Sequence, residues 1–214
     1  MVGVEWTLGY FFSIIEQKLK LGVKMIKRAR KTKETDIEIS LNLYGEGRSR
    51  IDTGVGFFDH MLEAFAKHSL IDLEVSCKGD LHIDAHHSVE DVGIVLGDAL
   101  NEAIYPVKGI ERFGSGVAVM DESAVECNLD LSNRAFLVYE VDIDGKVGDF
   151  DVELVEEFFR AVAFNMPLTL HLVMQRGKNR HHIIEATFKA FALAFRRAVA
   201  QNSRVKVPST KGVL

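Results

Sequence analysis

The feature that most constrains this chain is a motif that occurs twice. The segments IDAHHSVED (83–91) and NRHHIIEAT (179–187) each contain H-H-x-x-E, so four of the eight histidines lie in two copies of one pattern. The preceding segments 58–75 and 155–172 align without gaps, and their spacings to the histidine pairs differ by only two residues. The sequence therefore predicts an internal duplication of a strand-rich unit of about 80 to 90 residues that carries two helices.

Both halves show the same order of predicted elements. In the first half, apolar periodicity predicts a strand at 35–47 with a hairpin partner at 47–54, a helix at 57–69, a strand from 71 that turns at 78–80, and a helix at 86–103. In the second half it predicts strands within 114–133 and at 135–143, a helix at 151–165, a strand at 168–175 and a helix at 181–200. We therefore expect an α/β chain with halves at 25–113 and 114–214, preceded by an extension at 1–24.

Composition argues against several classes of protein. A net charge of −5 disfavours nucleic acid as the main partner, because phosphate backbones require a basic surface. No run approaches the roughly 20 apolar residues that cross a membrane. Cys77 and Cys127 lack C-x-x-C spacing, so we expect no disulfide framework and favour a cytoplasmic location. Residues 1–24 are either a start-site extension or an amphipathic helix that binds a partner.

The spacing within the motif suits metal binding. Residues four apart share a helix face, so His86 with Glu90 and His181 with Glu185 form two ligand pairs. The second histidine of each motif projects about 100° away, because a helix has 3.6 residues per turn. Each can reach the pair of the other half if the two helices face one another. The spacing then predicts two metal sites, formed by His86, Glu90 and His182 and by His181, Glu185 and His87.

The alignment of the two halves supplies a fourth ligand for each site. His60 aligns with Glu157, and both lie on the predicted helix that precedes the motif of their half. Imidazole and carboxylate ligands suit manganese, iron or zinc, and the absence of cysteine from the motifs disfavours a structural zinc site. His68, His82 and His171 have no comparable partners, so we interpret them as structural or surface residues.

The segments around these motifs resemble a known family. GFFDHML, DLHIDAHHSVEDVGIVLGDAL, GIERFGSG, GKNRHHIIEATFKAFALAFRRA and the terminal PSTKGVL are similar to the imidazoleglycerol-phosphate dehydratases of histidine biosynthesis, from about residue 28 to 214. The resemblance implies a duplicated α/β sandwich with the helices of its two halves packed together. It also implies two manganese ions per active site and a 24-subunit shell with sites between subunits, so ligands of one site can come from neighbouring chains.

The implied reaction converts imidazoleglycerol phosphate to imidazoleacetol phosphate. The departing hydroxyl lies next to the imidazole ring, and the proton leaves from the adjacent carbon, which no carbonyl group activates. A metal-bound imidazolate can expel the hydroxyl and give a diazafulvene-like intermediate, with the metal as Lewis acid and template. Glu34, in TKET, stands where the family has its proposed base, and the resemblance therefore assigns it the carbon-bound proton.

The resemblance also assigns a phosphate-binding set, and arginine suits bidentate contact with phosphate. Lys189 lies one turn after Glu185 on the same helix face, which places a positive charge beside the predicted metal site. The phosphate-binding positions are Arg112, Arg134, Lys189 and, in a C-terminal tail, Ser209, Thr210 and Lys211; the implied substrate contacts also include Glu34, His60, His86, His87 and His181.

Two positions depart from the family pattern. Ala85 stands directly before the first histidine pair, where many relatives have an aspartate that can orient a ligand imidazole. Asp84 is the candidate replacement. Glu157 stands where some relatives have histidine, and a carboxylate still suits manganese.

Two rival functions use part of the same residues. A metal-binding or storage shell needs the H-H-x-x-E motifs but neither Glu34 nor the phosphate-binding set. A two-metal hydrolase would use its paired metals to activate water. The joint presence of Arg112, Arg134, Lys189 and PSTKG favours the dehydratase over both.

Overall fold

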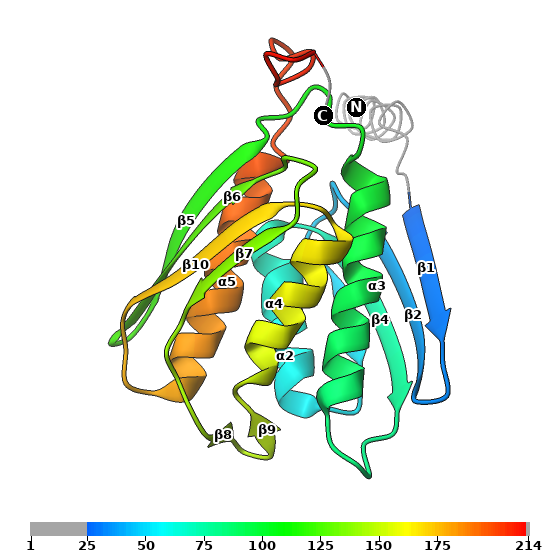
Figure 1. The fold of residues 1–214 in the computed structure, drawn as a ribbon, viewed down its shortest axis with the longest axis vertical. Coiled ribbons are helices and arrows are strands. Elements are labelled where there is room, and N and C mark those ends of the chain that lie inside the picture. Colours follow the sequence, from blue (N-terminus) through cyan, green and yellow to red (C-terminus); the bar gives the residue numbers. More distant parts are fainter. Residues whose placement is uncertain (1–24, 213–214) are drawn as a thin grey trace, which may run out of the picture.

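The structure is a computed structural model that describes residues 25–212, so the predicted extension 1–24 lies outside the described residues. Two four-stranded sheets form the outer layers of a sandwich, and four helices fill the space between them (Figure 1). The predicted class, an α/β sandwich with the helices of its halves packed together, is confirmed.

The first half supplies one sheet and two helices. Its strands lie in the order β1 (Met25–Lys31), β2 (Thr35–Asn42), β4 (Asp72–Gly79) and β3 (Ser49–Asp52), and its helices are α2 (Gly56–Ser69) and α3 (His86–Ile104). The second half repeats this plan with β5 (Phe113–Met120), β6 (Ser123–Asp130), β10 (Thr169–Arg176) and β7 (Phe136–Glu140), and with α4 (Leu154–Asn165) and α5 (Arg180–Ala198). A small hairpin of β8 (Lys146–Val147) and β9 (Phe150–Asp151) precedes α4.

The two sheets share one pairing scheme, which confirms the predicted duplication. In each, the first three strands in spatial order pair antiparallel and the fourth pairs parallel to the third. The first two strands of each half also begin at the same sequence spacing. β1 and β5 begin at Met25 and Phe113, β2 and β6 begin at Thr35 and Ser123, and both pairs of starting residues are 88 residues apart.

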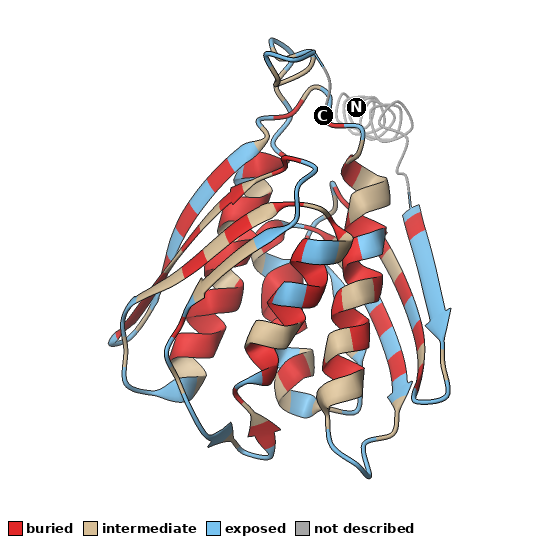
Figure 2. Cartoon of the chain, viewed as in Figure 1, coloured by how far each residue is buried: buried red, intermediate tan, exposed pale blue. Residues whose placement is uncertain are grey.

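Alternating residues explain why the helices lie inside. Along β5, every second residue is exposed on the outer face and the others are buried against α5. The helices are buried on the faces that meet one another, as Figure 2 shows. Six phenylalanines make ring contacts that join α2 to α4, α2 to α5 and α4 to α5, with centroids 4.9 to 5.4 Å apart. They lie at positions 58, 65, 158, 159, 188 and 191.

Helices of opposite halves pair across the sandwich: α2 packs on α5, and α3 packs on α4. Two glycines of α3 permit the second contact. A Cβ at Gly93 would lie 2.8 Å from the Ala161 Cβ, and one at Gly97 would lie 3.0 Å from the Val162 carbonyl oxygen. Any larger residue at either position would push α3 away from α4.

The predicted hairpin of 35–47 with 47–54 is wrong. β3 pairs parallel with β4, and β2 pairs antiparallel with β1 and β4. Asp72, the first residue of β4, explains the difference, because its carboxylate accepts hydrogen bonds from the backbone N–H groups of Glu46 at 2.9 Å and Arg48 at 3.0 Å. These bonds draw the turn across to β4. The basic run 27–33 lies largely on β1, an edge strand in which six of the seven residues are exposed.

Candidate metal centre

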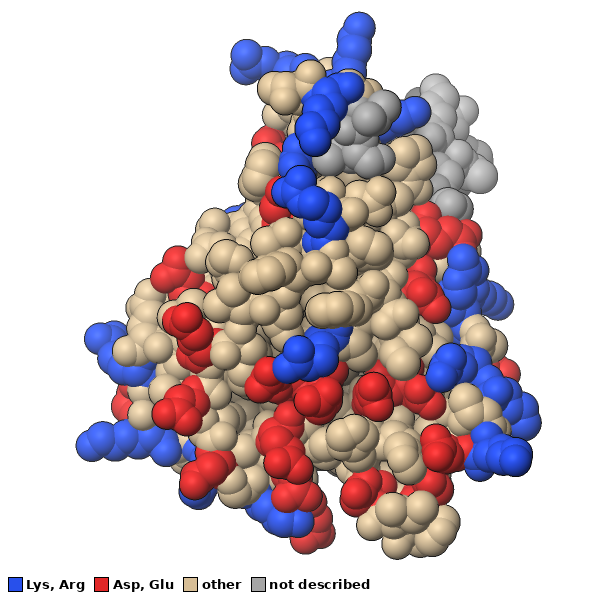
Figure 3. Space-filling model, in the orientation of Figure 1, with Lys and Arg blue, Asp and Glu red and all other residues tan. Residues whose placement is uncertain are grey.

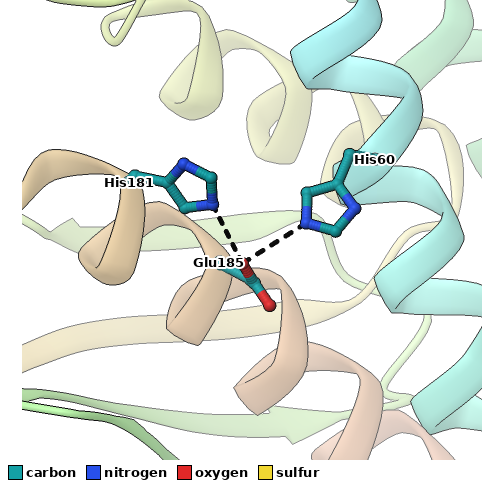
Figure 4. Close-up of side chains that lie close together, drawn as sticks. All are labelled: His60, His181 and Glu185. Atoms are coloured by element: carbon teal, nitrogen blue, oxygen red, sulfur yellow. Dashed lines mark hydrogen bonds and ion pairs between the residues drawn. The ribbon is translucent and has the colours of Figure 1, made fainter.

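The packing of α2 against α5 brings three predicted ligands together. His60 Nε2 lies 3.4 Å and His181 Nε2 lies 3.1 Å from the same oxygen, Oε2 of Glu185 (Figure 4). One ligand atom from each of the three residues lies within 4.8 Å of the other two. Two imidazole nitrogens and a carboxylate oxygen at this separation fit a divalent cation of the manganese, iron or zinc type.

Glu185 is the buried member of this group. Its side chain is only 8% exposed, and Lys189 Nζ contacts its Oε1 at 2.5 Å. Burial favours the neutral acid, but the hydrogen bond and charge of Lys189, together with His181 and His60, outweigh burial and hold the pKa of Glu185 below its usual range. The carboxylate is therefore ionised at neutral pH, as a metal ligand must be.

The second predicted ligand set is only partly assembled within the chain. His86 Nε2 lies 3.6 Å from Glu90 Oε2, one turn along α3. Glu157 lies on α4, the helix that packs against α3, and its carboxylate is 3.8 Å from Arg160 Nε. Among residues 25–212, His60, His181 and Glu185 form the group with three ligand atoms close together.

The predicted exchange of histidines between the halves does not occur within one chain. His87 contacts Asp80, with Nδ1 3.1 Å from Oδ2, and His182 contacts Glu122, with Nδ1 2.8 Å from Oε2. The reason lies in the packing, since α3 pairs with α4 and α5 pairs with α2, so α3 and α5 do not face each other as the prediction required. The hydrogen bond to Asp80 raises the pKa of His87, and that to Glu122 raises the pKa of His182.

Glu34 lies beside the first histidine pair. It belongs to the turn between β1 and β2, where the Thr32 hydroxyl accepts hydrogen bonds from the backbone N–H groups of Glu34 and Thr35. Thr35 Oγ1 in turn donates to Asp91 Oδ2 of α3 at 2.5 Å, which holds the turn against the helix. As a result, Glu34 Oε1 is 3.9 Å from His87 Nε2, and the Glu34 side chain is 55% exposed.

The predicted phosphate-binding residues other than Lys189 lie at the opposite end of the molecule. Arg112 precedes β5, Arg134 precedes β7, and Ser209, Thr210 and Lys211 follow α5 in the C-terminal tail. The β1–β2 and β5–β6 turns and the start of each helix are at the lower end of Figure 1, whereas the tail is at the top. On the face shown in Figure 3, Lys and Arg side chains gather around the tail and most Asp and Glu side chains lie in the lower half.

Arg112 is held by all three guanidinium nitrogens. Nε and Nη2 donate to the two oxygens of Asp130 at 2.6 and 3.0 Å, and Nη1 donates to the Pro208 carbonyl at 2.7 Å. The hydrogen bond with Asp130 raises the pKa of Arg112 further. Arg134 is more loosely placed, with Nη2 4.0 Å from Asp130 Oδ2. Asp130 therefore lies between the two arginines.

The start of α3 shows how the chain accommodates Ala85. Asp84 Oδ1 accepts a hydrogen bond from the His86 backbone N–H at 2.8 Å, so Asp84 stabilises the first turn rather than a ligand ring. Asn179 has the same position two residues before His181 and accepts from the His181 N–H at 2.9 Å. The imidazole of His87 is oriented by Asp80 instead.

Fold and site together define a duplicated α/β protein with a candidate metal-binding group of two histidines and a glutamate near the helix starts. The model of the imidazoleglycerol-phosphate dehydratase family matches residues 53–195. The chain is 70% identical over 190 residues to the imidazoleglycerol-phosphate dehydratase of Sulfurovum sp. (89% of this chain, all of the relative) and 68% identical over 192 residues to that of Campylobacter curvus (89% and 98%). The chain belongs to this family, and it is therefore a hydro-lyase of histidine biosynthesis.

Solved structures agree with this assignment. The imidazoleglycerol-phosphate dehydratase of Staphylococcus aureus superposes with a TM-score of 0.76 at 40% identity, covering 84% of this chain and all of that chain. The enzyme of Pyrococcus furiosus, in complex with (S)-C348, superposes with a TM-score of 0.77 at 38% identity, covering 87% and all. None of the helices in the described part of the chain has the length and apolar character that crossing a membrane requires.

Sequence reasoning overlooked three carboxylates around these residues: Asp80, Glu122 and Asp130. One sequence signal points to Glu122. Glu34 and Glu122 are 88 residues apart, as are the strands on either side of them, so the internal repeat makes them equivalent. The gapless alignment began only at Phe58 and did not reach the first two strands of each half. Nothing comparable marks Asp80 or Asp130, whose contacts depend on how the chain folds.

Proposed function

We propose that this chain dehydrates D-erythro-imidazoleglycerol phosphate to imidazoleacetol phosphate, with two Mn²⁺ ions per active site and other divalent metals able to replace them. The convergence of His60, His181 and Glu185 from two helices of different halves is the observation that carries the proposal. The remaining proposed ligands are His86, His87, Glu90, Glu157 and His182.

The reaction fits the groups at this end of the molecule. A bound divalent ion supplies Lewis-acid stabilisation of the substrate imidazole as an imidazolate. Expulsion of the hydroxyl from the imidazolate gives a diazafulvene-like intermediate, and the hydroxyl leaves as water with the proton that the imidazole ring has lost. Glu34, which is exposed and held beside His87, then accepts the proton of the adjacent carbon, and the resulting enol rearranges to the ketone. Lys189 neutralises part of the charge on Glu185 and keeps that carboxylate ionised.

The site is proposed to be completed by a neighbouring chain. Along α5, His181 and Ala198 are separated by 17 helical steps, about 25 Å at 1.5 Å per residue. A three-carbon chain that bears an imidazole and a phosphate cannot reach from the metal ligands to Arg112, Arg134 and the tail of the same chain. We therefore propose that the phosphate-binding residues other than Lys189 serve a metal centre of another subunit. They are Arg112, Arg134, Ser209, Thr210 and Lys211.

Exposed apolar side chains on the outer face of the second sheet support self-association. Phe113, Val117 and Val119 are 60%, 49% and 66% exposed on the outer face of β5, and Phe136 of β7 is 57% exposed. The two strands are the opposite edges of the sheet, and exposed apolar side chains gathered on a sheet face mark an interaction site. This surface is compatible with the proposed 24-subunit shell, in which the halves 25–113 and 114–214 of each chain contribute to sites between subunits.

Replacement of Glu34 tests the proposal against the metal-storage alternative. We expect Glu34→Gln to lower kcat at least 100-fold, because general-base catalysis contributes about 100- to 10,000-fold, while Mn²⁺ binding stays unchanged. Glu140→Gln, the same change at an exposed position of β7, serves as the control. Turnover of Glu34→Gln at the wild-type rate would contradict the assigned role, and absence of turnover in the metal-loaded wild type would contradict the function.

A further inference from the structure

Two equivalent glutamates of the internal repeat have different surroundings. Glu34 follows β1 and Glu122 follows β5, and each lies beside the second histidine of the H-H-x-x-E motif in its own half. Equivalent positions that keep one residue type but differ in contacts indicate a division of roles. The contacts show what each residue can do.

Both carboxylate oxygens of Glu122 contact neighbouring groups. Its Oε2 lies 2.8 Å from His182 Nδ1. Its Oε1 accepts from the backbone N–H groups of Lys178 at 3.1 Å and Asn179 at 2.7 Å, and from Ser123 Oγ at 3.1 Å. A carboxylate with both oxygens engaged in this way is fixed in place, because moving it would break four contacts at once.

In the first half, a different residue occupies the corresponding contact. Asp80 Oδ1 and Oδ2 lie 3.2 and 3.1 Å from His87 Nδ1, and the Asp80 side chain is 13% exposed. Glu34 is left 3.9 Å from the other ring nitrogen of His87, with its side chain 55% exposed. Asp80 thus contacts Nδ1 of His87 as Glu122 contacts Nδ1 of His182, and Glu34 takes no part in this contact.

The contacts also determine which ring nitrogen can bind a metal. A neutral histidine carries one N–H, and a carboxylate beside Nδ1 places that proton on Nδ1. Nε2 of His87 and His182 then presents a lone pair. Carboxylates that fix a ligand histidine in this manner raise its basicity and lock its ring orientation.

We propose that Asp80 and Glu122 are positioning residues that hold His87 and His182 with Nε2 free for metal, and that Asp80 thereby leaves Glu34 available to move the substrate proton. This inference rests on the proposed function, because it takes His87 and His182 as ligands and Glu34 as the base. It assigns opposite properties to Glu34 and Glu122, although the repeat makes them equivalent.

The experiment is Mn²⁺ titration of chelator-stripped protein, with free Mn²⁺ followed by electron paramagnetic resonance. Glu122→Gln keeps an amide oxygen for the backbone N–H groups but turns an NH₂ group towards Nδ1, which favours the tautomer with the proton on Nε2. We expect the affinity of at least one Mn²⁺ to fall 10- to 100-fold. Glu140→Gln, on exposed β7, should bind as the wild type does.

Asp80→Asn provides an independent variant, because the hydrogen bonds of the Asp80 side chain go to His87 and not to backbone groups of the helix start. Asp80→Asn should lower Mn²⁺ affinity about tenfold or more. Asp98→Asn, an exposed change on α3, the helix that carries His87, should not lower it. If Glu122→Gln fails to fold, Asp80→Asn decides the question. Glu34→Gln should retain wild-type affinity.

The outcomes separate this inference from the proposed function. Wild-type affinity in folded Asp80→Asn or Glu122→Gln, with or without a lower melting temperature, overturns the positioning role of that residue. A loss of affinity in Glu34→Gln equal to that in Glu122→Gln overturns the division of roles. If the wild type binds Mn²⁺ but does not dehydrate imidazoleglycerol phosphate, the affinity losses would still support the positioning roles while the function fails.

Discussion

At the scale of single residues, Arg112 shows that one side chain can be both a predicted substrate contact and a structural clamp. Its guanidinium joins Asp130 at the end of β6 to the Pro208 carbonyl in the tail that carries Ser209, Thr210 and Lys211. The Arg112 backbone is also in the left-handed region, with φ of 74°, and its N–H donates to the Ala198 carbonyl at the end of α5. Arg112 therefore determines where the predicted phosphate-binding tail lies.

We expect Arg112→Lys to raise KM for imidazoleglycerol phosphate about tenfold or more with little change in kcat. A lysine ammonium cannot reproduce the forked contact with Asp130 and the bond to Pro208, and hydrogen bonds to charged groups contribute about 1.5–3 kcal/mol each. Steady-state kinetics of the metal-loaded enzyme measures the effect. Arg176→Lys, an exposed change at the end of β10, is the control. An unchanged KM would show that the tail does not depend on this clamp.

Individual roles were only partly predictable from the sequence. The spacing of His181 and Glu185 predicts their shared helix face, because helical geometry alone sets it. The proximity of Glu34 to His87 depends on the β1–β2 turn and on the Thr35–Asp91 bond across 56 residues, so only the family resemblance pointed to Glu34. Asp80 gave no sequence signal because a turn brings it to His87, and Asp130 meets Arg112 only through the pairing of β5 with β6.

At the scale of elements, aromatic packing sets the helix pairing that assembles the metal centre. Phe191 of α5 contacts Phe65 of α2 with ring centroids 5.2 Å apart and Phe159 of α4 with centroids 5.4 Å apart. All three rings are buried. Phe191 thus holds α2, which carries His60, against α5, which carries His181 and Glu185.

We expect Phe191→Ala to lower the free energy of unfolding by about 3–5 kcal/mol, because it removes a fully buried aromatic side chain and leaves a cavity. Urea denaturation at matched protein concentration measures the change. Phe164→Ala, at a position of α4 where the side chain is 55% exposed, should change stability by less than about 1 kcal/mol. Equal effects of the two substitutions would contradict the proposed part of Phe191 in helix pairing.

Periodicity predicted the helices and most strands, but not how the strands pair. The predicted helices at 57–69, 86–103, 151–165 and 181–200 correspond to α2, α3, α4 and α5. The hairpin of β3 with β2 was predicted because the two strands are close along the chain. In the structure Asp72 binds the turn between them, and β3 pairs with β4 on the side away from β2. β1 escaped notice because six of its seven residues are exposed and four of the seven are Lys or Arg.

At the scale of the whole molecule, the duplication accounts for both the sandwich and the distribution of its candidate site. Each half brings its motif to the same end of the structure, because corresponding strands and helices run in corresponding directions (Figure 1). The phosphate-binding tail lies at the other end. The sequence could predict the halves and their candidate ligands, but not which chain completes each site, because that depends on the contacts between folded subunits.

A metal-dependent dehydration by this fold can be measured on the protein itself. Chelator-stripped protein is assayed for conversion of imidazoleglycerol phosphate to imidazoleacetol phosphate, before and after addition of Mn²⁺. We predict no turnover by the stripped protein and recovery of turnover as Mn²⁺ is added, because the proposed ligands then hold the ion that stabilises the imidazolate. Full turnover in the stripped protein, or none in folded protein that has bound Mn²⁺, would contradict the account.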